Sequence, residues 1–101
     1  MIYMITRVTL LPGKRAEYID EFKKIVGPVL EQQGCIEYDL YVDSTDQRFD
    51  NPKRDDVVVL SEKWEGIEDL QLHSRSAVMN EFRGRIKGLR ASSTYELLVN
   101  G

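Results

Sequence analysis

The order in which strand-like and helix-like patterns follow one another constrains the fold of this chain more than any other sequence feature. Residues 2–11 (IYMITRVTLL) are rich in β-branched and aromatic side chains and predict a strand. Apolar residues then recur at helical spacing from position 14 to about 33. Pro28 lies inside this helical pattern and removes a backbone donor, so we expect a kink or a local break near Gly27.

Two further strand-like segments come next, joined by a single connection. Residues 35–43 (CIEYDLYVD) alternate apolar and polar side chains, which is typical of a half-buried strand. Residues 57–65 (VVVLSEKWE) predict a third strand. The segment 44–56 between them is polar and contains Pro52, so it predicts a long exposed connection. Two strands joined by one loop are expected to pair antiparallel.

The last third of the chain predicts two helices and a fourth strand. Ile67, Leu70 and either His73 or Ser74 form a short apolar stripe, and Ser76 can cap the helix that follows. Residues 93–99 (STYELLV) predict the final strand. The order β-α-β-β-α-α-β matches a ferredoxin-like α+β fold, a four-stranded antiparallel sheet with helices on one face. A length of 101 residues suits a single such domain, spanning residues 1–101.

The first strand carries apolar side chains on both of its faces. One face has Ile2, Met4 and Val8, and the other has Tyr3, Ile5 and Leu11. A sheet with one face in water would alternate more cleanly between apolar and polar residues. An uncovered apolar face suggests a partner surface, and the simplest partner is a second copy of the chain related by two-fold symmetry. We therefore expect a homodimer through the sheet face.

Composition and charge argue against several classes of protein. The formal net charge is -3, and Lys and Arg are scattered among acidic residues, so a nucleic-acid partner is not expected. No apolar run approaches the roughly twenty residues that a membrane helix needs, so no membrane partner is expected either. The single cysteine, Cys35, cannot form an internal disulfide, which fits a reducing cytoplasm.

Two segments together resemble the antibiotic biosynthesis monooxygenase family. GCIEYDLYVD resembles the family's "pGc..y.l..d" strand, and VVLSEKWEGIEDLQLHSRS resembles its "f.l.E.W.s.ea...H..s" segment. An opening strand that ends in PGK and an amphipathic helix before Gly34-Cys35 support the match. The resemblance spans nearly the whole chain, from about Ile2 to Val99. One departure is QQGC in place of the family's usual EPGC.

The resemblance implies a dimeric α+β barrel, in which two sheets pack face to face. It also implies a pocket between sheet and helices for small aromatic or quinol-like molecules. Oxygenases of this family commonly work without metal, flavin or haem, so no cofactor is expected and molecular oxygen would be the co-substrate. The long segment 44–56 could be a dimer arm or a pocket lid. Haem-degrading relatives carry an axial His that SRSAVMNEFRGR lacks, which disfavours haem.

Three residues of the resembling segment are the main candidates for chemistry. His73 would be the base that takes a proton from a phenol or quinol, since its ordinary pKa lies near neutrality. Trp64 would form a pocket wall. Glu62 shares the strand face of Trp64 among apolar neighbours and needs a partner, for which Arg7 or Arg75 are candidates. Plain core packing is the competing interpretation for His73 and Trp64.

Further substrate-binding candidates are aromatic or basic. Tyr38 lies on the apolar face of its strand and is the best pocket phenol, and Tyr3 is another. Arg7 could hold an anionic substrate group, although a surface ion pair is its ordinary role. The functional hypothesis is cofactor-independent oxygenation of a small quinol-like or polyphenolic substrate. The alternatives are an isomerase of a small hydroxy-ketone using the same His, and a non-catalytic dimeric ligand-binding or stress-related module.

Overall fold

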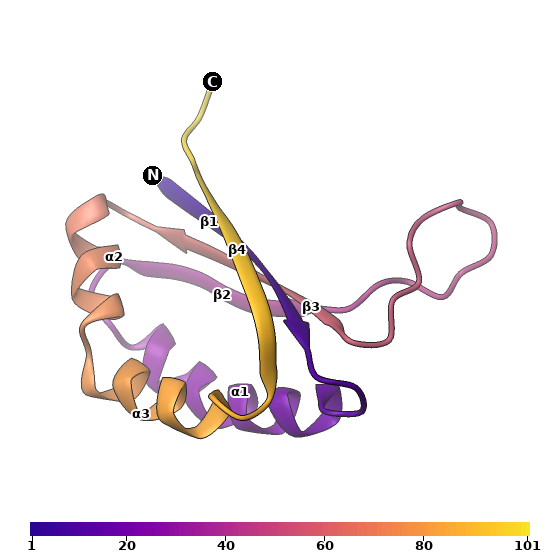
Figure 1. Ribbon diagram of the computed structural model, residues 1–101. Coiled ribbons are helices and arrows are strands. Elements are labelled where there is room, and N and C mark those ends of the chain that lie inside the picture. Colours follow the sequence, from indigo (N-terminus) through magenta and orange to yellow (C-terminus); the bar gives the residue numbers. More distant parts are fainter.

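Four strands form one antiparallel sheet, and three helices pack on one of its faces (Figure 1). The computed structural model describes residues 1–101. The elements in chain order are β1 (Ile2–Leu10), α1 (Arg15–Leu30), β2 (Cys35–Tyr41), β3 (Val57–Trp64), α2 (Ile67–Ser74), α3 (Ala77–Ile86) and β4 (Arg90–Leu98). The strands lie side by side in the order β2-β3-β1-β4, so the two outer strands are β2 and β4.

The predicted element order and fold class are confirmed. β2 pairs antiparallel with β3, as two strands joined by one loop should, and β1 pairs antiparallel with both β3 and β4. Ser76 caps α3 as predicted, because its hydroxyl accepts the backbone N–H of Met79 at 3.3 Å. β4 begins at Arg90, three residues earlier than the sequence indicated.

The local break expected near Gly27 does not occur. α1 continues through Pro28 to Leu30. Pro28 lies in the last turn of the helix, so only the single bond from position 28 to the carbonyl of residue 24 is missing. The next turn is still closed, since the backbone N–H of Glu31 donates to the carbonyl of Gly27 at 3.3 Å.

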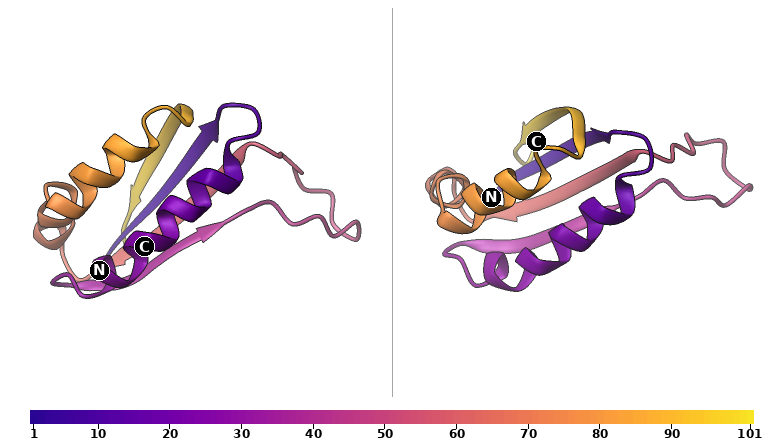
Figure 2. Two further views of the ribbon diagram at one scale, coloured as in Figure 1. Left: turned by 90° about the horizontal axis from the view of Figure 1, so that it is seen from below. Right: turned by 60° about the horizontal axis from the view of Figure 1, so that its bottom comes forward.

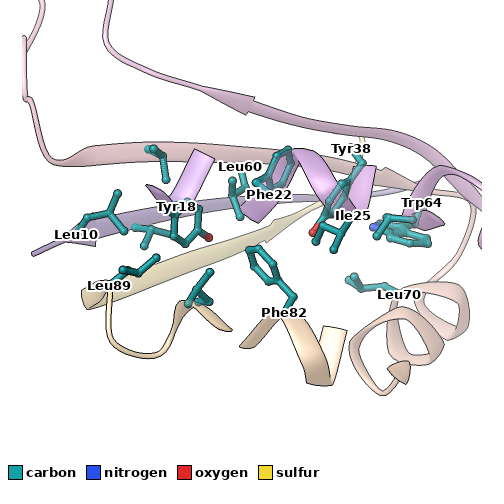
Figure 3. Close-up of a cluster of buried hydrophobic side chains, with 14 residues drawn as sticks. Leu10, Tyr18, Phe22, Ile25, Tyr38, Leu60, Trp64, Leu70, Phe82 and Leu89 are labelled. Carbon is teal, nitrogen blue, oxygen red and sulfur yellow. The ribbon is translucent and has the colours of Figure 1, made fainter. Parts of the chain in front are cut away.

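The hydrophobic core lies between the sheet and the helices (Figure 3). β3 contributes every second residue to it, because side chains alternate between the two faces of a strand. Val58, Leu60, Glu62 and Trp64 all point to the helix side and are buried, which confirms the face predicted for them. Tyr18 and Phe22 on α1 and Phe82 on α3 pack against this row.

The opposite face of the sheet has no helix over it (Figure 2). The strand register places Tyr3, Ile5 and Arg7 of β1 on this face, opposite Lys63, Ser61 and Val59 of β3. The neighbouring strands add Tyr41 and Leu98, which are 55% and 45% exposed. This uncovered face therefore mixes apolar and charged side chains, and Leu11, predicted to belong to it, lies beyond the end of β1.

The connection between β2 and β3 projects from the sheet as a long loop without regular structure, as predicted (Figure 1). Arg54 and Asp43 join the two ends of this loop, because Arg54 Nε donates to Asp43 Oδ2 at 2.9 Å. The hydrogen bonds from Arg54 lower the pKa of Asp43 to about 2. The loop extends away from α2 and α3, so it does not cover the helix side of β1 and β4.

None of the three helices is long and apolar enough to cross a membrane.

Candidate functional site

A cavity of about 210 Å³ lies between the helix-facing side of the sheet and helices α2 and α3. Most of its lining residues are hydrophobic. β1 supplies Met4 and Thr6, β3 supplies Leu60, and α3 supplies Phe82. An apolar cavity of roughly 150 Å³ holds one benzene ring. The present cavity therefore has room for one aromatic ring with short substituents.

Glu62 is the buried carboxylic acid of this cavity and His73 is its buried imidazole, and the two groups face each other. Glu62 is 5% exposed and His73 is 4% exposed. The His73 Nε2 atom lies 3.6 Å from Glu62 Oε1. The same carboxyl oxygen accepts the indole N–H of Trp64 at 3.1 Å. Glu62 and Trp64 meet because they are two residues apart on β3, whereas His73 arrives from the last turn of α2.

Gln32 determines which nitrogen of His73 carries the hydrogen. The Gln32 Oε1 atom lies 2.6 Å from His73 Nδ1. An amide oxygen only accepts, so Nδ1 is the donor and the lone pair of a neutral ring is left on Nε2. The backbone of His73 is fixed as well, because Ser76 Oγ donates to its carbonyl at 2.7 Å. His73 therefore presents an acceptor nitrogen toward Glu62 and the cavity.

Burial moves the pKa values of this pair in opposite directions. Loss of solvation raises the pKa of Glu62 to about 7, and the hydrogen bond from Trp64 only partly offsets this rise. Loss of solvation, together with the positive charge of Arg83, lowers the pKa of His73 to about 4. At neutral pH the imidazole is therefore uncharged and can accept a proton. The carboxyl group is close to the midpoint of its titration.

Aromatic rings surround His73. The ring centroids of Trp64 and His73 are 4.6 Å apart, and Tyr38 approaches edge-on at 5.4 Å. Tyr38 lines the cavity, stacks on Phe22 and donates its hydroxyl to Met79 Sδ at 3.7 Å. Burial and the Glu62 charge raise the pKa of Tyr38. Trp64 is fully buried behind the pair and does not line the cavity, so it orients Glu62 and forms no part of the cavity wall.

The structure does not bring Arg7 and Tyr3 to the cavity. Both point to the uncovered face, where Arg7 Nη1 donates to Glu96 Oε1 at 3.1 Å and the ammonium group of Lys63 lies 5.4 Å from the Tyr3 ring centroid. The predicted pairing of Glu62 with Arg7 or Arg75 is wrong. Arg7 is separated from Glu62 by the sheet itself, because odd-numbered residues of β1 face away from the helices.

Two smaller expectations concern α2 and the lone cysteine. Leu70 and His73 face inward, but Ile67, expected on the same stripe, is 42% exposed in the first turn after Gly66. Cys35, expected to form no internal disulfide, is a free half-buried cysteine, and burial raises the pKa of its thiol to about 11. No three His, Cys, Asp or Glu side chains converge to offer a metal site.

Sequence reasoning missed three polar residues of the site. Gln32 could have been noticed, because it lies in QQGC, where the sequence departs from the family pattern. Arg83 on α3 and Arg90 on β4 also line the cavity. No spacing in the sequence links these two arginines to His73, since they meet at the cavity only through the tertiary arrangement of helix α3 and the outer strand β4.

Comparison with known proteins places this chain in a family. The model of the antibiotic biosynthesis monooxygenase family matches residues 1–85, and the chain belongs to that family. It is 31% identical over 90 residues to the probable quinol monooxygenase YgiN of Escherichia coli strain K12, an alignment that covers 87% of this chain and 86% of that protein.

Solved structures agree on the fold. PA3566 of Pseudomonas aeruginosa superposes with a TM-score of 0.81 at 21% identity, covering 98% of this chain and 92% of the other. A conserved protein of Bacteroides thetaiotaomicron gives a TM-score of 0.79 at 27% identity, covering 96% and 94% of the two chains. Family membership and the fold support a monooxygenase-like role for the chain.

Proposed function

We propose that this protein is a monooxygenase that oxidises a small quinol-like aromatic molecule with molecular oxygen and without a bound cofactor. The observation that carries the proposal is the buried His73–Glu62 pair, which lines an apolar cavity with room for one ring. The identity of 31% to a probable quinol monooxygenase supports the same class of substrate. The missed residue Gln32 adds a reason for His73 to act as a base, because it holds the Nδ1 hydrogen.

The chemistry follows from the protonation states of the pair. His73 Nε2 accepts a proton from one hydroxyl of the quinol, and the resulting anion is electron-rich enough to pass an electron to molecular oxygen. The two radicals combine to form a carbon–oxygen bond. One oxygen atom stays on the ring and the other leaves as water, so that quinol plus oxygen gives hydroxyquinone plus water. The oxygen–oxygen bond breaks as the oxygenated ring carbon loses its hydrogen, and the departing oxygen takes that proton and the one held by His73 to become water. Glu62 stabilises the imidazolium while it exists.

Oxygen uptake by the purified protein tests this proposal. Single-ring hydroquinones should be consumed faster than by autoxidation, and His73→Asn should reduce the enzymatic rate about a hundredfold because the base is lost. Asn retains a donor near the Nδ1 position, so the contact with Gln32 survives. Leu72→Asn, on the exposed side of the same helix, is the matched control. Equal rates for the two variants, or uptake no faster than autoxidation, would contradict the proposal.

The Glu62–His73 pair also suits a second reaction class. Two neighbouring groups that can hold one proton between them can move it between adjacent carbons of a hydroxy-ketone, which is an isomerisation. That reaction needs no oxygen, so turnover under nitrogen separates it from oxygenation. Absence of turnover with either substrate class would favour a non-catalytic ligand-binding module.

We further propose that two copies of the chain associate through the uncovered face of the sheet. Tyr3, Ile5 and Val59 form its apolar centre, which two-fold symmetry would place against the same residues of a second copy. Ile5→Lys should weaken the dimer more than tenfold, because a charge would be buried there. Leu72→Lys on the exposed side of α2 should have no effect. Sedimentation equilibrium measures both, and an unchanged dimer in Ile5→Lys would place the interface elsewhere.

A further inference from the structure

Two arginines line the cavity without a carboxylate partner. Arg83 and Arg90 both contribute to the lining, and neither takes part in an ion pair. Arg7, Arg48, Arg54 and Arg85, which lie elsewhere, each pair with an Asp or Glu. Arg15 and Arg75 also lie elsewhere and have no carboxylate partner, so Arg83 and Arg90 differ from the other arginines by lining the cavity and not by being unpaired.

The charge of the cavity is opposite to the charge of the chain. The chain carries a formal net charge of -3, yet the only acidic residue among the lining residues is Glu62. Burial raises the pKa of Glu62 to about 7, so this carboxyl is partly protonated at neutral pH. Arg83 and Arg90 are both solvent-exposed, so they place positive charge where the cavity meets solvent, and this charge favours an anionic ligand over a neutral one of the same shape.

The two arginines lie toward different ends of the cavity. The positive charge of Arg83 acts on His73 and Tyr38, whereas the charge of Arg90 acts on Tyr18. Figure 3 shows Tyr18 near Leu10 and Leu89 at one end of the buried cluster, and Trp64 and Leu70 at the other end. Arg90 pairs with Leu10 in the strand register, whereas the His73 ring lies beside that of Trp64, so the two residues belong to opposite ends of the cluster.

The arginines also differ in how their donors are used. Arg83 Nη2 donates to the backbone carbonyl of Ser74 and to Asn80 Oδ1, which hold its charge close to His73. Arg90 makes no side-chain hydrogen bond within the protein, so its planar fork of donors is free. A free guanidinium is suited to bind a carboxylate with two parallel hydrogen bonds.

We propose that the substrate of this site is a single-ring hydroquinone that carries one carboxylate, with a ring hydroxyl at His73 and the carboxylate bound by Arg90. This inference rests on the function proposed above and names its substrate class. Phe82, Leu60 and Tyr38 enclose the ring between these two ends. Arg83 favours the phenolate that forms beside His73, because its positive charge is fixed there by Ser74 and Asn80.

A binding comparison between two matched compounds tests the inference without any turnover. The compounds are 2,5-dihydroxybenzoate and 2,5-dihydroxybenzamide, which have nearly the same shape but differ by one negative charge. Titration calorimetry under nitrogen should show that the wild-type protein binds the benzoate at least tenfold more tightly than the benzamide. Arg90→Gln should lower this preference about tenfold and leave the affinity for the benzamide unchanged.

Lys87→Gln is the matched control, because it removes one positive charge just after α3 at a residue that does not line the cavity. The preference of Lys87→Gln for the benzoate over the benzamide should equal that of the wild-type protein. Arg90→Lys should retain part of this preference. Equal affinity for the two compounds in the wild-type protein, or an unchanged preference in Arg90→Gln, would overturn the inference. Oxygen uptake with neutral hydroquinones but no charge preference would overturn this inference alone. A charge preference without oxygen uptake would overturn the oxygenase function and leave the anion site standing.

Discussion

Replacing Gly34 with Ala is expected to lower the free energy of unfolding by about 3 kcal/mol. Gly34 has a φ angle of 76°, which lies in the left-handed region and costs a residue with a Cβ roughly 1 kcal/mol or more. A Cβ at this position would also overlap the carboxylate of Asp69 and come within 2.7 Å of the Asp69 Cβ. A rotation of the Asp69 side chain cannot relieve the second contact, so backbone must shift, at a cost of about 1–3 kcal/mol.

Gly13→Ala is the matched control for this prediction. Gly13 has a φ angle of 79°, but a Cβ there would meet no atom within 4 Å. It therefore carries the cost of the left-handed backbone alone, about 1 kcal/mol. Denaturant unfolding of both variants isolates the contribution of the contact with Asp69. Equal losses of stability in Gly34→Ala and Gly13→Ala would mean that the chain relieves the contact with Asp69 without a free-energy cost.

The same turn explains how the site is assembled. The carbonyl of Gly34 accepts the backbone N–H of Glu65 at 2.8 Å, and Gln33 Nε2 donates to Asp69 Oδ1 at 2.9 Å. These two bonds tie the end of α1 to the start of α2. Gln32, one position earlier, is thereby brought within reach of His73. The close contact between Gly34 and Asp69 leaves no room for a Cβ at position 34. This contact is therefore part of the same packing that places the amide oxygen of Gln32 beside His73.

The fold could be predicted because its signals are local. Strand and helix periodicities, the cap at Ser76 and the order of elements each depend on neighbouring residues in the chain. Part of the site is local too, since Glu62 and Trp64 share a face by being two residues apart. His73 follows at the end of the next helix, so its approach to them could be anticipated from the order of the elements.

The rest of the site could not be read from spacing. β1 is apolar on both faces, so its alternation does not show whether Arg7 or Thr6 faces the helices, and the structure places Thr6 at the cavity and Arg7 on the uncovered face. Arg83 on α3 and Arg90 on β4 come from elements that only the folded chain brings to one cavity. Those contacts depend on tertiary geometry, to which no short sequence pattern corresponds.

The pH dependence of stability gives the second large expected effect. In the unfolded chain the ordinary pKa values are 4.5 for Glu62 and 6.5 for His73, and in the folded protein they are about 7 and about 4. Between pH 4.5 and 6.5 the pair holds one proton in both states, on His73 when unfolded and on Glu62 when folded. Its contribution to stability is therefore flat over this range, because stability changes with pH only where the two states bind different numbers of protons.

Glu62→Gln should remove the carboxyl titration that offsets the titration of His73, so that stability would no longer be independent of pH over this range. A carboxyl whose folded pKa is raised stabilises the fold fully below pH 4.5, and its contribution is lost as the pH rises to about 7. The variant has no carboxyl group to titrate, so it does not lose this contribution as the pH rises. Its unfolding free energy should therefore rise relative to that of the wild-type protein by about 3 kcal/mol between pH 4.5 and 7. Urea unfolding of both proteins at intervals across this range measures the difference.

His73→Asn should show the opposite sign. A histidine whose folded pKa is lowered contributes stability above pH 6.5 that is lost as the pH falls toward 4. Relative to the wild-type protein, this variant should therefore gain about 3 kcal/mol on going from pH 6.5 to 4. If both variants ran parallel to the wild-type protein, neither group would titrate differently in the folded state. Burial would then not be the reason that the His73 imidazole is neutral, although the proposed proton transfer depends on that neutral state.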